Sequence, residues 1–224
     1  MPADTPALPV PPAPRRVSGP YRVCFVCLGN ICRSPMAEVV LRAELAQAGL
    51  AGLVEVDSAG TGDWHIGGPM DRRAQAELAR RGYDGSAHRA RQFGPSWFGH
   101  RDLVLALDRA NLANLREMAP DQEAAGPRLR LLRSFDPALA GPAAGEDRQQ
   151  GQVPDPYGGT PGDYAAAFDL VQPAVRGLAG QLAVLLGVAA VPARVDDPPG
   201  FPQGAGQEGT PRPGAVPQQR RGGR

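Results

Sequence analysis

Residues 22–35 read RVCFVCLGNICRSP, and this stretch joins a strand pattern directly to a helix pattern. The apolar run Arg22–Val26 is rich in β-forming residues and predicts a buried strand. A helix is predicted from Ser34 to Ala48, because Pro35 suits a first helical turn and Gly49 suits a C-terminal stop. The loop between the two patterns therefore leads straight into a helix N-terminus.

Strand and helix patterns continue to alternate along the chain. Further strands are predicted at Val54–Ser58, Leu103–Leu107 and Leu129–Leu132, and further helices at Asp71–Arg81, Asn111–Met118 and Asp163–Leu186. In the last helix, Asp163 is a candidate N-cap, and Pro173 is expected to introduce a kink. The alternation predicts an α/β fold in which helices cover both faces of a parallel twisted sheet. Ligands bind beyond the carboxyl ends of the strands in such sheets, so the loop after the first strand is the predicted site.

The ends of the chain differ in composition from its centre. Residues 1–20 are rich in Pro and Ala, and residues 192–224 are rich in Pro, Gly and Arg. Such segments bury too little apolar surface to offset chain entropy, so both are predicted to be disordered tails around a single domain at residues 21–191. The formal net charge of the chain is only +1, so a nucleic-acid partner is not expected.

Cysteine usage points to a reducing compartment. The chain has three cysteines, Cys24, Cys27 and Cys32, and this odd, tightly spaced set is not a disulfide framework. The N-terminal residues lack the apolar core of a secretory signal, and no run approaches the ~20 apolar residues of a membrane span. We therefore expect a cytoplasmic protein that does not insert into a membrane.

The loop at residues 27–34 has the features of a phosphate-binding site. Unpaired amides at a helix N-terminus and the helix dipole favour an anion, and Gly29 and Asn30 tolerate the left-handed backbone angles that let amides converge. Arg33 adds a planar fork that can hold two phosphate oxygens. The positive pocket favours the thiolate of Cys27, which can attack phosphorus, and Ser34 can donate its hydroxyl to the sulfur. The predicted phosphate-binding residues are Leu28, Gly29, Asn30, Ile31, Cys32, Arg33 and Ser34.

The stretch Cys27–Pro35 resembles the phosphate loop of the low-molecular-weight protein tyrosine phosphatases. The similarity continues, in the family's order, through DSAGTGDWH at 57–65, HRARQ at 88–92, LALD at 105–108 and PDPYG at 154–158. It covers about residues 21–186 and neither tail. The resemblance implies a three-layer fold with a four-stranded parallel sheet, and a monomeric enzyme that acts on tyrosine-phosphorylated proteins without a cofactor.

The resemblance also implies roles for residues outside the loop. By sequence alone, Asp155 is one of several loop carboxylates, whereas the family's Asp-Pro-Tyr loop makes it the general acid beside Cys27 and Arg33. Trp64 and Tyr157 would form an aromatic slot for the substrate ring. Many members carry a second aromatic residue where this chain has Gly158.

Supporting positions follow from the same resemblance. Ser58 and His88 match residues that brace the phosphate loop, with Asn30 as the expected contact, and Asp108 matches a structural position. Cys32 matches a cysteine that can form a reversible disulfide with the nucleophile and protect it from over-oxidation.

Several other functions compete with this prediction. Cys24 and Cys27 form a Cys-x-x-Cys pair, but no further ligands complete a zinc site, so no metal is expected. A thioredoxin-coupled arsenate reductase needs cysteines downstream of Cys32, and the chain has none there. A protein-arginine phosphatase of the same family carries threonine where this chain has Ile31, which argues for tyrosine. A non-catalytic phosphoprotein-binding module is expected to lack the nucleophile, the arginine or the acid.

Overall fold

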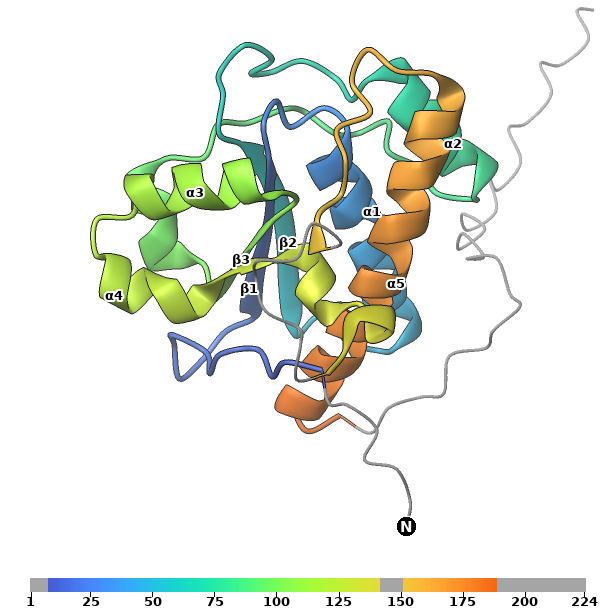
Figure 1. Cartoon of the computed structure of the whole chain (residues 1–224). Helices are drawn as coiled ribbons and strands as arrows, with labels where there is room; N and C mark the ends of the chain where they lie inside the picture. The colour runs from blue at the N-terminus through green and yellow to red at the C-terminus, as the bar shows by residue number, and fades with distance from the viewer. Residues whose placement is uncertain (1–7, 142–150, 189–224) are drawn as a thin grey trace, which may run out of the picture.

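The central feature of the computed structural model, which describes residues 8–141 and 151–188, is a sheet of parallel strands (Figure 1). The sheet has four strands in the order β2-β1-β3-β4. Their bounds are β1 Tyr21–Cys27, β2 Val54–Gly60, β3 Leu103–Ala106 and β4 Leu129–Leu131. Each predicted strand is present, although Leu107 lies just beyond β3 and Leu132 begins a 3-10 turn instead of ending β4.

The helices follow the strands in the predicted alternation. The α-helices are α1 Arg33–Gln47, α2 Arg72–Arg80, α3 Arg109–Met118, α4 Gln122–Ala125 and α5 Pro161–Leu185, and the 3-10 segments are η1 Pro95–His100, η2 Gly126–Arg128, η3 Leu132–Phe135 and η4 Pro137–Leu139. None of the helices in the described part of the chain has the length and apolarity needed to cross a bilayer.

The ends of the helices confirm some predicted signals and correct one. Gly49, which was predicted to end the first helix, has a φ of 71°, and Gly82 after α2 has a φ of 81°; both are left-handed angles typical of a helix stop. The prediction of Asp163 as the N-cap of α5 is wrong, because Thr160 is the N-cap and Asp163 is the third helical residue of a capping box. Pro173 lies inside α5 and cannot donate a backbone hydrogen bond there.

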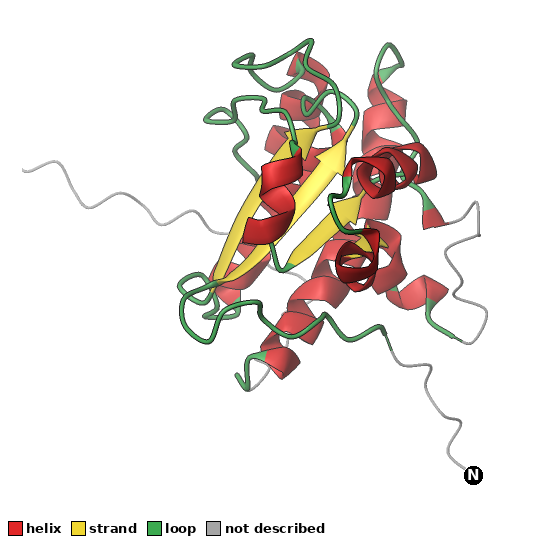
Figure 2. Cartoon of the chain, turned by 90° about the vertical axis from the view of Figure 1, so that its left-hand side faces the viewer, coloured by secondary structure: helices red, strands yellow, loops and turns green. Residues whose placement is uncertain are grey.

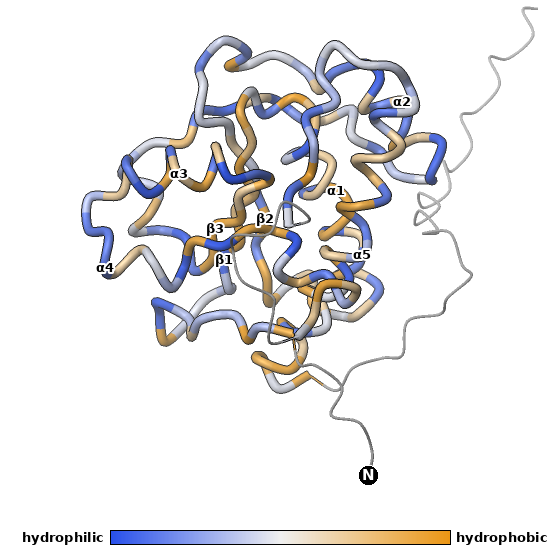
Figure 3. The backbone as a smooth tube through the Cα atoms, viewed as in Figure 1, coloured by the Kyte–Doolittle hydropathy of each residue, from blue (hydrophilic) through white to orange (hydrophobic). Residues whose placement is uncertain are grey.

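The sheet separates two apolar cores, because alternate residues of a strand point to opposite faces. Val23 and Phe25 of β1 lie in the core that α1, α2 and α5 cover. Cys24 and Val26 lie in the opposite core with Phe98 of η1 and residues of α3 and α4. Figure 2 shows the twisted sheet between these helical layers, and Figure 3 shows the apolar strands at the centre. The three-layer arrangement matches the predicted fold class.

The segment that precedes β1 contacts the domain. Asp102 is the main contact: its carboxylate accepts hydrogen bonds from the backbone N–H groups of Arg15 at 2.6 Å and Arg22 at 2.8 Å. The hydroxyl of Tyr21 donates to the carbonyl of Pro12 at 3.0 Å. These contacts join part of the predicted N-terminal tail to the domain, and the domain boundary stays a prediction. The predicted tail residues 1–7 and 192–224 lie outside the described residues.

Replacement of Asp102 by alanine is expected to lower the free energy of unfolding by about 2–4 kcal/mol. The substitution leaves two backbone N–H donors without their charged acceptor, and each such loss costs about 1–3 kcal/mol. Urea denaturation followed by circular dichroism measures the change. Glu55→Gln is the matched control, because the exposed pair of Glu55 with Arg22 should contribute less than about 1 kcal/mol. Equal losses in the two variants would contradict the prediction.

Candidate active site

The loop at residues 28–32 lies at the carboxyl edge of the central strand, between the end of β1 at Cys27 and the start of α1 at Arg33. Two other segments reach the same edge. Asp108 follows β3, and the N–H of Val153 donates to the carbonyl of Leu107 at 2.8 Å, which holds the segment leading to Asp155 beside the strand. The parallel sheet thus brings together residues that lie far apart in the sequence.

The sulfur of Cys27 is surrounded by hydrogen-bond donors. The backbone N–H of Asn30 donates to it at 3.3 Å, and the hydroxyl of Ser34 lies 3.0 Å away. The helix N-terminus adds positive potential, and the N-cap residue Cys32 makes no side-chain hydrogen bond that would satisfy its first amides. These surroundings suit a negatively charged group in front of Cys27.

Asn30 holds the loop in shape. Of the two loop residues expected to tolerate left-handed angles, Gly29 and Asn30, it is Asn30 that adopts one, with a φ of 54°. The φ of Gly29 is not in that range, and a Cβ atom there would approach the His65 ring to 3.0 Å. Asparagine tolerates left-handed angles better than other side chains.

The side chain of Asn30 uses all its main hydrogen-bonding groups. Its Nδ2 donates to the hydroxyls of Ser34 at 2.9 Å and Ser58 at 2.8 Å, and its Oδ1 accepts from the N–H of Arg91 at 2.8 Å. Its carbonyl oxygen contacts Nε2 of His88 at 2.7 Å. The structure therefore contains the contacts to Asn30 that were expected of Ser58 and His88.

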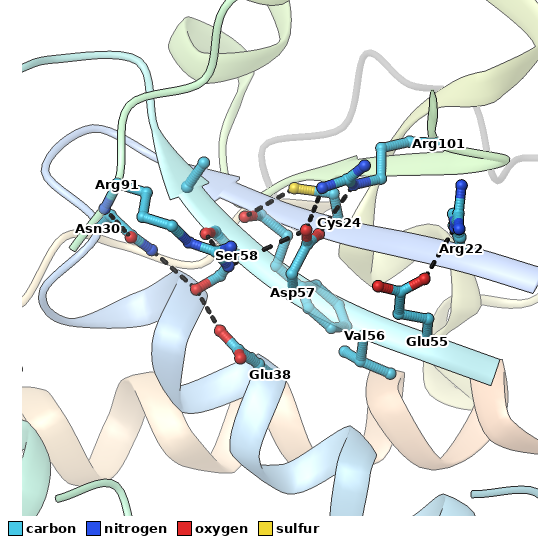
Figure 4. Close-up of polar contacts among 12 residues, drawn as sticks. Arg22, Cys24, Asn30, Glu38, Glu55, Val56, Asp57, Ser58, Arg91 and Arg101 are labelled. Carbon is cyan, nitrogen blue, oxygen red and sulfur yellow. Dashed lines mark hydrogen bonds and ion pairs between the residues drawn. The ribbon is translucent and has the colours of Figure 1, made fainter. Parts of the chain in front are cut away.

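A buried carboxylate sets the direction of this network (Figure 4). Glu38 pairs with Arg42 at 2.7 Å and accepts a hydrogen bond from Ser58 at 2.5 Å. Ser58 donates its hydroxyl proton to Glu38, so the Ser58 oxygen can accept a hydrogen bond from the side-chain amide of Asn30. The other hydrogen of that amide is donated to the Ser34 oxygen. The Ser34 proton can then point only to acceptors, which are the Cys27 sulfur and the carbonyl oxygen of Ala59 at 3.3 Å. The network thus leaves the Ser34 hydroxyl proton for one of these two acceptors, of which the Cys27 sulfur is the nearer.

His88 completes the support as a neutral ring. Burial lowers its pKa below the ordinary value, although the hydrogen bond to Asn30 and the charge of Glu38 oppose this shift. A carbonyl oxygen can only accept, so Nε2 of His88 carries the proton that it donates to Asn30. Its Nδ1 lies 4.0 Å from a carboxylate oxygen of Glu38. The ring thus acts as a fixed donor behind the loop.

Replacement of Asn30 by alanine is expected to lower turnover about 10- to 100-fold and to destabilise the domain. The change removes three side-chain hydrogen bonds and places alanine at a φ of 54°, where the left-handed conformation costs about 1–2 kcal/mol. Asn30→Gly is the matched variant, because it loses the same hydrogen bonds without the strain. Thermal unfolding should rank wild type above Asn30→Gly, and Asn30→Gly above Asn30→Ala. A glycine variant no more stable than the alanine variant would contradict the role of strain.

Arg33 lies beneath the pocket with 2% of its surface exposed. Its Nη1 donates to Asp108 at 2.6 Å and to the carbonyl of Val153 at 3.1 Å, and its Nη2 donates to Asp155 at 2.7 Å. Burial lowers the pKa of Arg33, but Cys27, Asp155 and Asp108 raise it by more, so the net pKa lies above the ordinary value. Nε of Arg33 is buried without a hydrogen-bond partner in the described part of the chain, which leaves one donor of the fork for a ligand.

Asp155 combines contact with Arg33 and access to solvent, since 41% of its side chain is exposed. One oxygen binds Arg33, and the other accepts from the N–H of Tyr157 at 3.2 Å. Asp108 has a different place: one oxygen binds Arg33, and the other caps α3 through the N–H of Asn111. Asp155 is thus the carboxylate that borders the pocket, whereas Asp108 anchors the arginine to the end of the sheet.

The pocket in front of Cys27 contains most of the predicted site. Its lining residues are Cys27, Leu28, Gly29, Ile31, Cys32, Arg33, Trp64, His65, Asp155 and Tyr157. Asn30 in the loop and Ser34 in the first turn of α1 were also predicted to bind phosphate; both are fully buried, and both contact the sulfur. Trp64 and Tyr157 also line the pocket, and they are 71% and 60% exposed.

His65 lines the pocket, although no role in the site was expected of it. Its ring centroid lies 6.1 Å from that of Tyr157, and the open side of Gly29 faces it. Its position directly after Trp64 was the available signal.

The two cysteines of the Cys-x-x-Cys pair do not face a common site, because Cys24 and Cys27 lie in the cores on opposite faces of the sheet. Within residues 8–141 and 151–188, no cluster of His, Cys, Asp or Glu side chains is suited to a metal ion.

Comparisons with known proteins agree with this geometry. The sequence profile of the family described as low molecular weight phosphotyrosine protein phosphatase matches residues 22–185. A low molecular weight protein-tyrosine-phosphatase of Streptomyces coelicolor is 52% identical over 158 residues, which are 70% of this chain and 91% of the relative. The low molecular weight protein-tyrosine phosphatase A of Mycobacterium tuberculosis is 43% identical over 162 residues, or 72% of this chain and 91% of the relative.

Solved structures of similar proteins have the same fold. The crystal structure of YfkJ from Bacillus subtilis matches 77% of this chain and 98% of its own, with a TM-score of 0.63 and 34% identity. A protein tyrosine phosphatase from Entamoeba histolytica matches 73% of this chain and 97% of its own, with a TM-score of 0.64 and 29% identity. With a profile match across residues 22–185 and a loop built around Cys27 at the end of β1, the chain belongs to the low molecular weight phosphotyrosine protein phosphatase family.

Proposed function

We propose that this chain hydrolyses phosphotyrosine in proteins through a phosphocysteine intermediate. The observation that carries the proposal is the convergence of Cys27, Arg33 and Asp155 on one pocket at the end of β1. In the first step the Cys27 thiolate attacks phosphorus, and the bond from phosphorus to the tyrosyl oxygen breaks. Loop amides and Arg33 hold the phosphoryl oxygens, and Asp155 donates a proton to the departing oxygen.

The second step releases phosphate. Asp155, now a carboxylate, takes a proton from a water molecule as that water attacks the phosphocysteine. The sulfur then leaves as a thiolate, and the donor hydroxyl of Ser34, 3.0 Å away, stabilises it. Every proton and nucleophile in the two steps comes from water or from side chains of this chain.

The shape of the pocket supports phosphotyrosine as the substrate. The phosphate group must reach Cys27 at the bottom of a slot between Trp64 and Tyr157, and the flat tyrosyl ring is long enough to span it. Ile31 adds an apolar side chain to the lining, which favours an aromatic ring over the charged guanidinium of phosphoarginine. Gly158 carries no second aromatic wall, so we expect tolerance for varied residues beside the phosphotyrosine.

The substrate is tested by comparing phosphotyrosine and phosphoarginine peptides of the same sequence, without added metal. We expect phosphate release from phosphotyrosine alone. Phosphate release confined to phosphoarginine would preserve the mechanism and overturn the substrate. Tight binding of both peptides without release of phosphate would instead point to a phosphoprotein-binding module.

Cys32 is proposed to protect the nucleophile from irreversible oxidation. Burial, followed by the charge of Asp71, raises the pKa of Cys32 to about 12, so Cys32 stays a thiol while Cys27 reacts with peroxide. Peroxide converts the Cys27 thiolate to a sulfenic acid; the Cys32 sulfur then displaces water to form a disulfide, which a dithiol can reduce.

After brief treatment with hydrogen peroxide, wild type should recover most of its activity with dithiothreitol, and Cys32→Ser should recover several-fold less. Cys24→Ser is the matched control, because Cys24 is equally buried but lies on the opposite face of the sheet. Mass spectrometry should find a Cys27–Cys32 disulfide in wild type. Equal recovery of Cys32→Ser and wild type would remove the protective role.

We further propose that the protein acts in the cytoplasm as a monomer, with residues 21–191 as its phosphatase domain. The cysteines Cys24, Cys27 and Cys32 are free thiols, and a catalytic thiolate requires a reducing compartment. A single copy of the chain supplies all the residues that line the pocket. Size-exclusion chromatography with light scattering measures the oligomeric state.

A further inference from the structure

The segment that carries the proposed acid has little backbone rigidity of its own. Gly158 and Gly159 follow Tyr157, and Gly158 has a φ of 79°. Glycine has access to more backbone conformations than any other residue, so this pair resists movement weakly. Within the segment, the N–H of Gly159 donates to the carbonyl of Pro156 at 2.9 Å. A stable position for Asp155 therefore depends on contacts from outside the segment.

Arg73 of α2 supplies such a contact. Its Nη1 donates to the carbonyl of Gly159 at 2.9 Å, directly before the N-cap of α5. Its Nε and Nη2 donate to the two carboxylate oxygens of Asp71 at 3.2 and 3.0 Å. The guanidinium carbon lies 4.9 Å from the ring centroid of Tyr164 in α5. Three kinds of contact thus hold the planar group in one orientation.

The partners of Arg73 also contact the phosphate loop. The backbone N–H of Asp71 donates to the carbonyl of Ile31 at 2.8 Å, and the hydroxyl of Tyr164 lies 3.9 Å from the sulfur of Cys32. Asp71 also caps α2 through the N–H of Arg73, which ties the loop contact to the start of a helix. Arg73 therefore binds Asp71, which contacts the phosphate loop, and also binds Gly159 in the segment that carries Asp155.

We propose that Arg73 is a positioning residue that sets the distance between Asp155 and the leaving oxygen of the substrate. The inference rests on the proposed function, because it assigns to Arg73 an effect that passes through Asp155. Proton transfer is sensitive to such placement, and a displacement of about 1 Å can lower the rate about 100-fold. Only an arginine fork serves both neighbours, because lysine has one nitrogen and cannot bind both oxygens of Asp71 and the carbonyl of Gly159.

The test is a series of aryl phosphates whose leaving groups have increasing pKa, with kcat/KM as the measured quantity. For phosphotyrosine peptides, whose tyrosyl leaving group has a pKa near ~10, Arg73→Gln and Arg73→Lys should each lose about 10- to 100-fold. For nitrophenyl-type esters, which depart with little help from an acid, the loss should be less than about 2-fold. A uniform loss across the series would contradict the proposal.

Arg80→Gln is the matched control on the same helix. Arg80 pairs with Glu77 at 2.7 Å and has no contact with the segment of Asp155. This variant should retain wild-type kcat/KM for every ester. Circular dichroism and thermal unfolding of each variant distinguish a local effect from a general loss of structure. Full activity of Arg73→Lys would also overturn the proposal, because it would show that the positive charge at this position is sufficient without the arginine fork.

A double-mutant cycle with Asp155→Ala separates this inference from the proposed function. If Arg73 acts through Asp155, adding Arg73→Gln to Asp155→Ala should lower kcat/KM for phosphotyrosine by less than about 2-fold more. Independent, multiplicative losses would overturn the role of Arg73 and leave the acid in place. If Asp155→Ala showed no selective loss of kcat/KM on substrates with poor leaving groups, the role of Asp155 as the general acid would be wrong.

Discussion

Cys27→Ser protein should release phosphate from phosphotyrosine peptides at least about 10⁴-fold more slowly than wild type. The reason lies in the contacts of the sulfur. The N–H of Asn30 donates to atom Sγ, the hydroxyl of Ser34 lies 3.0 Å from it, and this arrangement suits an anion. A serine at the same position remains a neutral hydroxyl, because the side chain that the described residues place within hydrogen-bond reach is the Ser34 hydroxyl, which is not a base.

The measurement is the initial rate of phosphate release at saturating peptide. Cys24→Ser is the matched control, since it replaces a buried cysteine of the same strand on the face away from the pocket. This control should keep near wild-type turnover and only lose some stability. The Cys27→Ser protein should still bind phosphate, because Arg33 and the loop amides are unchanged. If Cys27→Ser kept more than about 1% of wild-type turnover, the assignment of Cys27 as the nucleophile would be wrong.

Asp155→Ala is expected to lower kcat/KM for phosphotyrosine by about 10²- to 10⁴-fold, the usual contribution of general acid catalysis. A second effect should accompany the loss. Asp155 is bound to Nη2 of Arg33 at 2.7 Å, so its carboxylate competes with a phosphate group for the same donor and repels its charge. Inorganic phosphate should therefore inhibit Asp155→Ala several-fold more tightly than wild type.

Product inhibition by phosphate and kcat/KM are measured on the same preparations. Asp108→Asn is the informative comparison, because Asp108 also binds Arg33 but lies at the cap of α3 and does not line the pocket. Asp108→Asn should change stability and phosphate binding, but it should not lower kcat/KM selectively for substrates with poor leaving groups. If phosphate inhibited Asp155→Ala less tightly than wild type, the inference that Asp155 competes with phosphate for Arg33 would be wrong.

Local signals account for the predictions that succeeded. Gly49 and Gly82 end helices because left-handed backbone angles are available to glycine whatever surrounds it. The run Arg22–Val26 forms a strand because it is apolar on both faces, which suits a strand covered by helices on each side. The order of motifs in the chain also identified the family, since each motif is a short stretch of adjacent residues.

The sequence alone left choices between nearby residues undecided, and the N-cap of α5 was predicted wrongly for this reason. Thr160 and Asp163 are both good N-caps, and the helix begins at the earlier one because Asp163 then completes a capping box with it. Gly29 and Asn30 can both adopt a left-handed angle, and Asn30 does so because its side chain and carbonyl bond to four groups from other segments. Such choices depend on partners that a local pattern does not contain.

By itself, the sequence determined the succession of strand, phosphate loop and helix, and the residue types that perform the chemistry. These features arise from neighbouring residues, whose backbone preferences act over a few positions. Only the tertiary structure decided that Glu38 orients Ser34 through Ser58 and Asn30, and that Arg73 connects the two catalytic segments. These contacts join positions from different elements, and hydrogen bonds acquire a direction only when the parallel sheet has brought their donors and acceptors together.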